Sequence, residues 1–246
     1  MIMKRNIKPL LALTVFLSAT ALQAQNVQLH YDFGRNIYPD EEAGRQKVTM
    51  TLEHFNADKH GSWFYFVDLD LSRKYAEAFY TEISREINLG KNTPFAIHVE
   101  YNGGTSRNSS FQHAGLAGAA WNGHTADFSK TWGVQLMYKH YFKSYDYTSA
   151  YASAQLTGIW GMNFAANAIR FSGFIDFWRG QKANGHGQLV MLTEPQLWYN
   201  LNTIESLKDV NLSVGTEVEI SNNFIFNTYN DKAFFVNPTL ALKWTF

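Results

Sequence analysis

The 246-residue chain contains no cysteine. Disulfide bonds and thiolate metal sites are therefore excluded, and so is a lipid attached to an N-terminal cysteine. The eight histidines show no His-Glu-x-x-His spacing, so a zinc site would have to be assembled from side chains on distant segments. The sequence predicts neither a metal site nor a bound cofactor.

Long apolar runs are lacking beyond the N-terminal segment, which excludes a helical membrane protein. Within that segment, Lys4, Arg5 and Lys8 precede the run PLLALTVFLSATALQA, which closes on small residues. This pattern is typical of a secretory signal peptide. We expect residues 1–24 to be removed by cleavage after Ala24, with Ala21 as the alternative, and residues 25–246 to form one domain.

An excess of charge of one sign is also missing, because 21 Lys and Arg balance 21 Asp and Glu. Loss of the three N-terminal cations would leave the mature chain slightly acidic, so a nucleic-acid partner is not expected. No Gly-x-Ser-x-Gly elbow and no phosphate-binding glycine loop is found. The sequence therefore predicts no catalytic residue.

Aromatic residues, in contrast, are abundant and are spread from end to end. They make up 16% of the chain, with 19 Phe, 13 Tyr and 7 Trp, while the mean hydropathy is only −0.27. Transmembrane β-barrels have this composition, because they carry an apolar band with aromatic girdles outside and polar residues inside.

Apolar and polar residues alternate with a period of two, which places successive side chains on opposite faces of a strand. The apolar faces include Leu212, Val214, Val218 and Ile220 in one segment and Ile169, Phe171, Ile175 and Phe177 in another. The chain ends in the same way on LALKWTF, where Leu240, Leu242, Trp244 and Phe246 share one face. The pattern predicts a lipid-facing side and a lumen-facing side.

About twelve such segments alternate with turn signals such as GKNTP and WNGHT. They begin near Asn26, Gln46, Ser62, Ala76, Phe95, Phe111, Ala126, Ser149, Asn167, Gln188, Val210 and Phe234. An even number favours a closed antiparallel transmembrane β-barrel, all-β, in the outer membrane of a Gram-negative bacterium, with both termini on the periplasmic side. A soluble β-sandwich is the alternative, although its inner faces would have to absorb nearly all the aromatic rings.

The residues on the polar side of each alternating segment are predicted to line the lumen. We expect Glu53, Phe55, Phe64, Phe66, Asp68, Glu82, Arg170, Phe174, Asp176, Glu194 and Trp198 to bind a solute there. Rings offer stacking faces, and carboxylates accept hydrogen bonds from hydroxyl groups. The alternative interpretation is structural, because charges that pair across a lumen and rings that fill it also stabilise a barrel.

Two segments resemble the nucleoside-specific channel-forming outer-membrane proteins, the Tsx type. The first is TMTLEHFNADKHGSWFYFVDLDL, residues 49–71, and the second is FYTEISREINLGK, residues 79–91. The resemblance implies a twelve-stranded barrel that takes up nucleosides by facilitated diffusion. It also implies solute contacts, which fall on Glu53, Phe55, Phe64, Phe66 and Glu82.

The hypothesis is an outer-membrane channel for passive diffusion of small polar solutes, with the nucleoside selectivity that the resemblance implies, and not an enzyme. Two alternatives stay open: a barrel enzyme that acts on lipid, with His54 or His140 on the apolar parity, and a plugged barrel that docks a partner through SNNFIFNTYNDK. The expected partners are the solute, the membrane lipid and the barrel assembly machinery, which would recognise the terminal Phe246.

Overall fold

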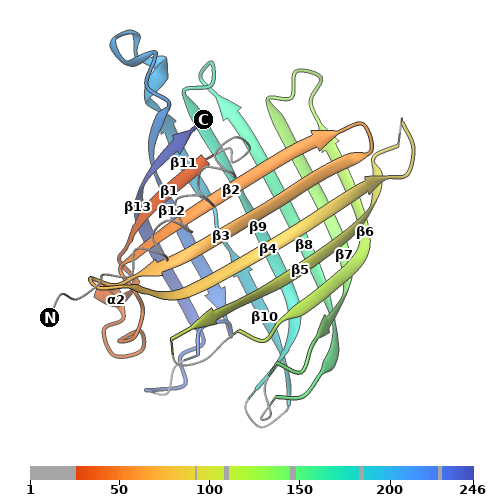
Figure 1. Cartoon of the computed structure of the whole chain (residues 1–246), viewed down its shortest axis with the longest axis vertical. Coiled ribbons are helices and arrows are strands. Elements are labelled where there is room, and N and C mark those ends of the chain that lie inside the picture. The colour runs from red at the N-terminus through yellow and green to blue at the C-terminus, as the bar shows by residue number, and fades with distance from the viewer. Residues whose placement is uncertain (1–25, 92, 108–110, 145–147, 183–185, 227–228) are drawn as a thin grey trace, which may run out of the picture.

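The computed structural model describes residues 26–91, 93–107, 111–144, 148–182, 186–226 and 229–246 (Figure 1). The predicted signal peptide, residues 1–24, lies outside this part of the chain. Strands dominate the described residues, and the helical turns α2 (Gly34–Ile37), η1 (Leu201–Thr203) and η2 (Glu205–Leu207) lie in connections between strands. No described helix is both long enough and apolar enough to cross a membrane.

The strands of the described residues follow one another along the sheet. The first seven are β1 (Asn26–Asp32), β2 (Val48–Asp58), β3 (Gly61–Leu71), β4 (Ala76–Asn88), β5 (Phe95–Ser106), β6 (Ala114–His124) and β7 (Lys130–Tyr141). The others are β8 (Tyr151–Phe164), β9 (Ile169–Gln181), β10 (Gly187–Thr193), β11 (Gln196–Asn200), β12 (Leu212–Asn222) and β13 (Phe234–Thr245).

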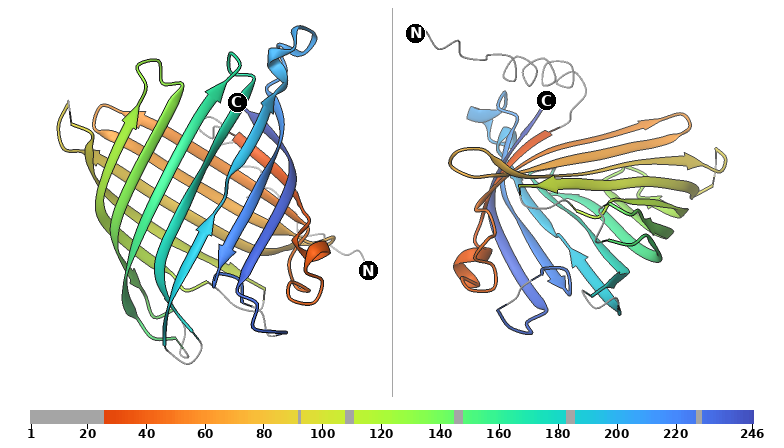
Figure 2. Two further views of the ribbon diagram at one scale, coloured as in Figure 1. Left: turned by 180° about the vertical axis from the view of Figure 1, so that it is seen from behind. Right: turned by 60° about the horizontal axis from the view of Figure 1, so that its bottom comes forward.

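The sheet closes on itself. All neighbouring strands are antiparallel, and β13 pairs with both β12 and β1, so the last strand is joined to the first. Closure leaves no edge strand with unpaired backbone groups, which is the condition for a sheet that spans a bilayer. Figures 1 and 2 show the strands tilted around a single barrel.

β10 and β11 are two halves of one barrel strand. Both pair with β9 and with β12, and the same register runs through both halves. Pro195 separates them because it has no N–H to donate to the ladder, although its carbonyl still accepts from the N–H of Val218 at 3.0 Å. The barrel formed by the described strands is therefore twelve-stranded, as the alternation predicts.

Predicted and observed strand starts agree closely. The largest difference is at β7, which begins at Lys130 rather than near Ala126, because Asp127 accepts hydrogen bonds from Thr125 and Ser129 and holds residues 125–129 in a turn. β6 begins at Ala114 rather than near Phe111. Its alternation is blurred because Ala114 and Leu116 face inward, where they pack on Met137 of β7.

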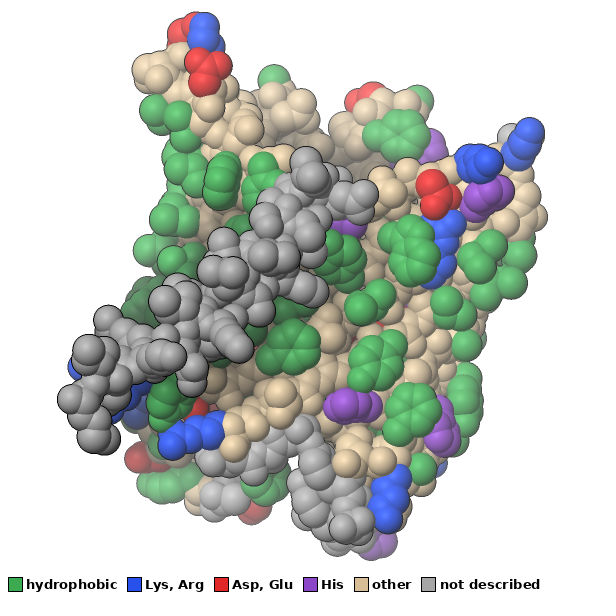
Figure 3. All heavy atoms as spheres, viewed as in Figure 1, with side chains coloured by type: hydrophobic (Ala, Val, Ile, Leu, Met, Phe, Trp, Pro, Cys, Tyr) green, Lys and Arg blue, Asp and Glu red, His purple; other side chains and the backbone are tan. Residues whose placement is uncertain are grey.

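The apolar parity forms the outer wall. Leu136 is 63% exposed, whereas its chain neighbour Met137, which faces inward, is 2% exposed. Figure 3 shows hydrophobic side chains spread over one wall, with most Lys and Arg side chains near its ends. At the C-terminus, Leu240, Leu242 and Trp244 are more than half exposed on the outside, and Lys243 is buried on the inside.

The connections differ at the two ends of the barrel. At the end that carries the termini, the connections include the tight turns 59–60 and 165–168, and at the opposite end they include the long segments 33–47 and 223–233. Longer connections are typical of the extracellular end. One connection departs from the expected arrangement: residues 201–211, with η1 and η2, form a long excursion at the termini end (Figure 1).

Candidate functional site

The register places every predicted solute-binding residue on the lumen side. One group lies on β2 to β4, where Glu53 pairs with Phe66, Phe55 with Phe64, and Phe66 in turn with Glu82. A second group lies on β9 to β11 and comprises Arg170, Phe174, Asp176, Glu194 and Trp198. The two groups lie on opposite walls of the lumen, because β3 and β9 are six strands apart in the twelve-stranded barrel.

Four rings form a row along the inner wall, which we call the aromatic ladder. Phe64 lies 6.1 Å from Phe66, Phe66 lies 6.0 Å from Tyr80, and Tyr80 lies 5.3 Å from Phe111. Phe64 is near the termini end of β3, and Phe111 stands at the opposite mouth. Gly104 makes room for the last ring, because a Cβ there would come within 2.8 Å of Phe111.

Carboxylates flank the aromatic ladder. Phe66 is held between Glu53 on β2 and Glu82 on β4, its two cross-strand neighbours. The hydroxyl of Tyr80 donates to Glu82 at 2.8 Å, and that of Thr51 donates to Asp68 at 2.5 Å. Rings and hydrogen-bond acceptors therefore alternate across this wall.

Acidic side chains outnumber basic ones on the lumen side of the described strands. The carboxylates are Asp32, Glu53, Asp68, Asp70, Glu82, Glu86, Glu100, Asp176, Glu194, Glu217 and Glu219. The cations are Lys139, Arg170 and Lys243, and Arg45 reaches in from a connection. The lining is therefore net negative, as the sequence predicts.

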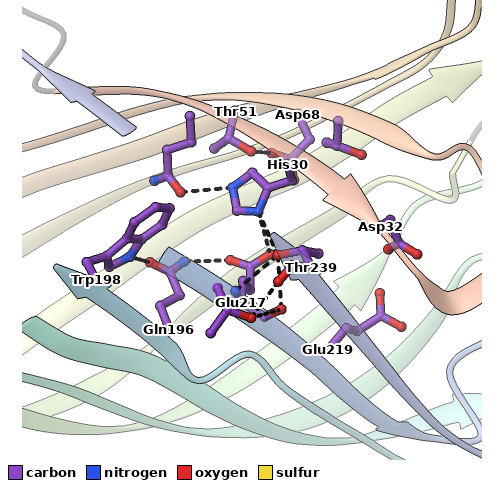
Figure 4. A network of polar contacts seen from close by, with 12 residues as sticks. His30, Asp32, Thr51, Asp68, Gln196, Trp198, Glu217, Glu219 and Thr239 are labelled. Carbon is purple, nitrogen blue, oxygen red and sulfur yellow. Dashed lines mark hydrogen bonds and ion pairs between the residues drawn. The ribbon is translucent and has the colours of Figure 1, made fainter. Parts of the chain in front are cut away.

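Trp198 lies within a packed network of polar side chains (Figure 4). Its indole N–H donates to Gln196 at 2.9 Å, and Gln196 donates to Glu217 at 2.6 Å. The ammonium group of Lys243 lies 3.9 Å from the centre of the indole ring. Trp198 is 1% exposed, so its ring face is covered by the protein itself.

His30 joins this network from β1. Its Nε2 is 3.0 Å from Gln28, its Nδ1 is 3.2 Å from the hydroxyl of Thr239, and Glu217 lies 3.9 Å away. Figure 4 shows these side chains pointing toward one another from β1, β11, β12 and β13. The network ties the closing strands of the barrel together.

Two further networks line the wall on β4 to β9. His98 lies between Glu86 at 3.2 Å and Glu100 at 3.0 Å. Lys139 donates to Gln155 at 2.7 Å, and Thr157 carries the chain of hydrogen bonds on to Asp176. Among the residues with described positions, no cluster of His, Asp and Glu has the arrangement of a metal site.

The connection between β1 and β2 bends back into the barrel mouth. Arg45 donates to Asp32 at 2.8 Å and to Glu219 at 3.0 Å. Burial alone would lower the pKa of Arg45, but the carboxylates of Glu219 and Asp32 raise it, so the side chain is a permanent cation. Glu42 accepts from Asn237 at 2.8 Å, and burial raises the pKa of its carboxyl group.

Several residues that line the lumen are not predicted from the sequence. Phe111 completes the aromatic ladder, and Tyr141 stacks on Tyr151 at 4.4 Å with Lys139 5.2 Å from the Tyr141 ring. The signal for β7 is present in the sequence, since Gln135, Lys139 and Tyr141 alternate with the outward-facing Leu136 and Tyr138. Phe111 carries no such signal, because it precedes β6.

The two histidines of the apolar parity lie on the outer wall, as expected. His54 stacks on Tyr65 with a ring distance of 5.1 Å. His140 lies between Tyr138 and Phe142, at 6.3 and 5.3 Å. Both contact aromatic rings of the lipid-facing surface.

Solved structures with a similar fold include two porins and one further barrel. The NanC porin has a TM-score of 0.56 and 12% identity, over 91% of this chain and 99% of that chain. The KdgM porin in complex with disordered oligogalacturonate has a TM-score of 0.49 and 12% identity, with the same coverage. LpxR from Salmonella typhimurium has a TM-score of 0.42 and 7% identity, over 91% of this chain and 100% of that chain.

The closed barrel, its lipid-facing apolar wall and its polar lumen define a β-barrel of the Gram-negative outer membrane, porin-like in fold. Within this class, the chain belongs to the family described as Domain of unknown function (DUF5020), whose model matches residues 24–246. A comparison with curated proteins finds no match.

Proposed function

We propose that the protein is a channel for passive diffusion of small polar solutes across the outer membrane, with a preference for solutes that carry a planar ring, such as nucleosides. The observation that carries the proposal is the aromatic ladder. A merely water-filled pore gains nothing from a row of inward rings, whereas a planar solute can stack on each ring in turn.

The immediate surroundings of Phe66 suit such a solute. With Glu53 on one side and Glu82 on the other, a ring stacked on Phe66 has carboxylate oxygens at both of its edges. Hydroxyl groups of a ribose and amino groups of a base donate hydrogen bonds to such acceptors. The resemblance of residues 49–71 and 79–91 to nucleoside-specific channels supports the same solute class.

The second group of predicted residues has a different role in this proposal. Trp198 is covered by Lys243, so it positions this cation instead of stacking on the solute. Phe174, Asp176 and Glu194 are half-buried on the opposing strands, where they limit the width and set the charge of the passage. Arg170 stands next to Trp198 in the register and offers the complementary charge.

Conductance in planar lipid bilayers tests the proposal. The purified barrel is expected to pass ions, and adenosine or uridine on one side is expected to reduce the current in a saturable way. Phe66→Ala should weaken this block roughly tenfold, because stacking of a base on one ring contributes about 1–3 kcal/mol. Phe177→Ala, on the lipid-facing side of β9, is the matched control and should leave the block unchanged.

The same measurement separates the channel from a plugged barrel. Two connections meet at one mouth, where Asn230 donates to Glu41 at 2.9 Å and Arg45 binds Asp32 and Glu219. This observation favours a closed mouth and a docking role as the second candidate function. A barrel that inserts into the bilayer but passes no current would support the plugged barrel. Current that no nucleoside blocks would support a channel but contradict the preference for planar solutes.

A further inference from the structure

The outer wall carries a groove that the transport function does not use. Its volume is about 590 Å³, within the range of small-molecule sites. The lining residues are Phe79, Thr81, Tyr101, Gly103, Gly104, Thr105, His113, Phe142, Lys143 and Ser144. Apart from Gly104, the lining residues on β4 and β5 lie on the lipid-facing side of their strands. The groove therefore opens toward the membrane.

Glycines let aromatic rings lie close to the wall in this groove. Thr81 of β4 pairs with Gly103 of β5, and the ring of Tyr101 lies over Gly103, since a Cβ there would come within 2.6 Å of the Tyr101 hydroxyl. Gly115, also outward-facing, lies under the ring of Phe142, since a Cβ there would come within 3.1 Å of that ring. The groove is therefore lined by the rings of Phe79, Tyr101 and Phe142 together with Thr81 and Gly103.

The groove lies where the apolar wall meets the charged end of the barrel. It is at the end opposite the termini, which carries the longer connections and is therefore the extracellular end. Farther along the same strands, away from this end, the wall continues with Ile83 and Val99, which are 45% and 41% exposed. An occupant would have its acyl part on this apolar wall and its head group at the rim.

The rim of the groove carries two cations, Lys143 and Arg107. Lys143 is part of the lining. Arg107 follows β5 with its side chain 60% exposed, 4.9 Å from the ring of Tyr75 and 4.0 Å from the carboxylate of Glu77. His113 is held by the hydroxyl of Tyr101 at 2.8 Å. The charge at this point of the wall is complementary to a phosphate group.

We propose that this groove binds a phosphorylated glycolipid of the outer leaflet, a lipid of the lipid A type. Its acyl chains would lie on Phe79, Tyr101 and Phe142, and its phosphate would be bound by Lys143 and Arg107. The assignment follows from three observations in one place: an apolar groove open to lipid, its location at the extracellular end, and cations at its rim. It is independent of the solute that passes through the lumen.

Native mass spectrometry of the full-length barrel in detergent tests the assignment, with bisphosphorylated lipid A as the probe. Two lipids serve as competitors. Dephosphorylated lipid A keeps the acyl chains but has no phosphate, and phosphatidylglycerol carries a single phosphate. Loss of Arg107 and Lys143 in the double variant R107Q/K143Q should weaken lipid A binding by about fivefold per cation removed. Lys130→Gln, an outward-facing cation at the other end of β7, is the matched control.

A second variant probes the groove without altering its charge. Gly103→Leu fills the groove at the expense of a shift of the Tyr101 hydroxyl, the atom nearest to a new side chain at 2.6 Å. Binding should fall while heat-modifiable migration of the folded barrel is retained. Equal binding of phosphorylated and dephosphorylated lipid A, equal competition by phosphatidylglycerol, or unchanged binding by both variants would each overturn the assignment.

Discussion

Glu41 and Glu42 are adjacent in the chain but have opposite environments. Glu41 is exposed and accepts a hydrogen bond from Asn230 at 2.9 Å, which lowers the pKa of its carboxyl group. Glu42 is 4% exposed, and burial raises the pKa of its carboxyl group above the ordinary value of 4.5. The second Glu42 oxygen and the side-chain oxygen of Asn237 are both buried without a hydrogen-bond partner among the described residues, and a Cβ added at Gly34 would come within 2.6 Å of each.

The two residues should therefore respond to pH in opposite directions. Glu42 holds its proton to higher pH in the folded state, so its contribution to stability is present below about 4.5 and is lost as the pH rises through the folded pKa. Glu41 contributes above its ordinary pKa, and this contribution is lost as the pH falls. We expect the amides of residues 38–45 to lose protection as the pH rises above 4.5.

Hydrogen exchange, corrected for intrinsic rates, measures this loss. Glu42→Gln should abolish the loss of protection of residues 38–45 at rising pH, because glutamine cannot ionise, and should leave only the opposite pH dependence of Glu41. Glu41→Gln, the matched control one residue away, should leave the loss at rising pH in place. A pH profile that is equal in the two variants would contradict the opposite pKa shifts.

At the scale of single residues, the sequence predicts which face a side chain takes but not what covers it. The period of two is a local property, so inside and outside can be assigned for Phe66 or Trp198 from their neighbours in the chain. Whether a ring is open to the lumen depends on partners from distant strands. Lys243 of β13 covers Trp198 of β11, and no pattern within either segment indicates this.

At the scale of strands, the interruption between β10 and β11 depends on a glycine across the ladder. Gly173 on β9 has φ of 155°, and a Cβ there would lie 2.5 Å from the carbonyl oxygen of Glu194 and 3.0 Å from the Cα of Pro195. Backbone atoms cannot yield as a flexible side chain would. The close approach of the two strands therefore requires glycine at this position.

Gly173→Ala is expected to destabilise the barrel by about 1–3 kcal/mol, the cost of a strained backbone conformation. The folded form should convert to the unfolded form at a lower temperature when it is followed by heat-modifiable electrophoretic migration. Gly158→Ala is the matched control, because its nearest neighbour would be a methyl group of Ile175 at 3.2 Å. Equal shifts in the two variants would show that the approach to Pro195 carries no strain.

Strand existence and topology could be predicted because antiparallel neighbours follow one another in the chain. The register between strands could not, since it depends on contacts between distant segments, such as that of His30 on β1 with Thr239 on β13. The same limit applies to Phe111, which completes the aromatic ladder only because Gly104 on the preceding strand leaves space for it.

At the scale of the whole molecule, the charges of the lumen should decide which ions pass. The chain as a whole is balanced, with 21 basic and 21 acidic residues, yet carboxylates outnumber cations on the inner wall. Folding therefore separates charge between the lumen and the rest of the surface. A channel lined in this way attracts cations and repels anions.

We expect the reversal potential under a KCl gradient to show preference for potassium over chloride. The preference should be strong near 0.1 M salt and weak near 1 M, because the screening length falls from about 10 Å to about 3 Å. Glu53→Gln combined with Glu100→Gln should reduce it, since both carboxylates lie on the lumen side of the barrel. Glu205→Gln is the matched control, because this carboxylate is 91% exposed in the connection that contains η2. Chloride preference in the unmodified protein, or an equal response of the double variant and the control, would show that these inner carboxylates do not set the charge of the ion path.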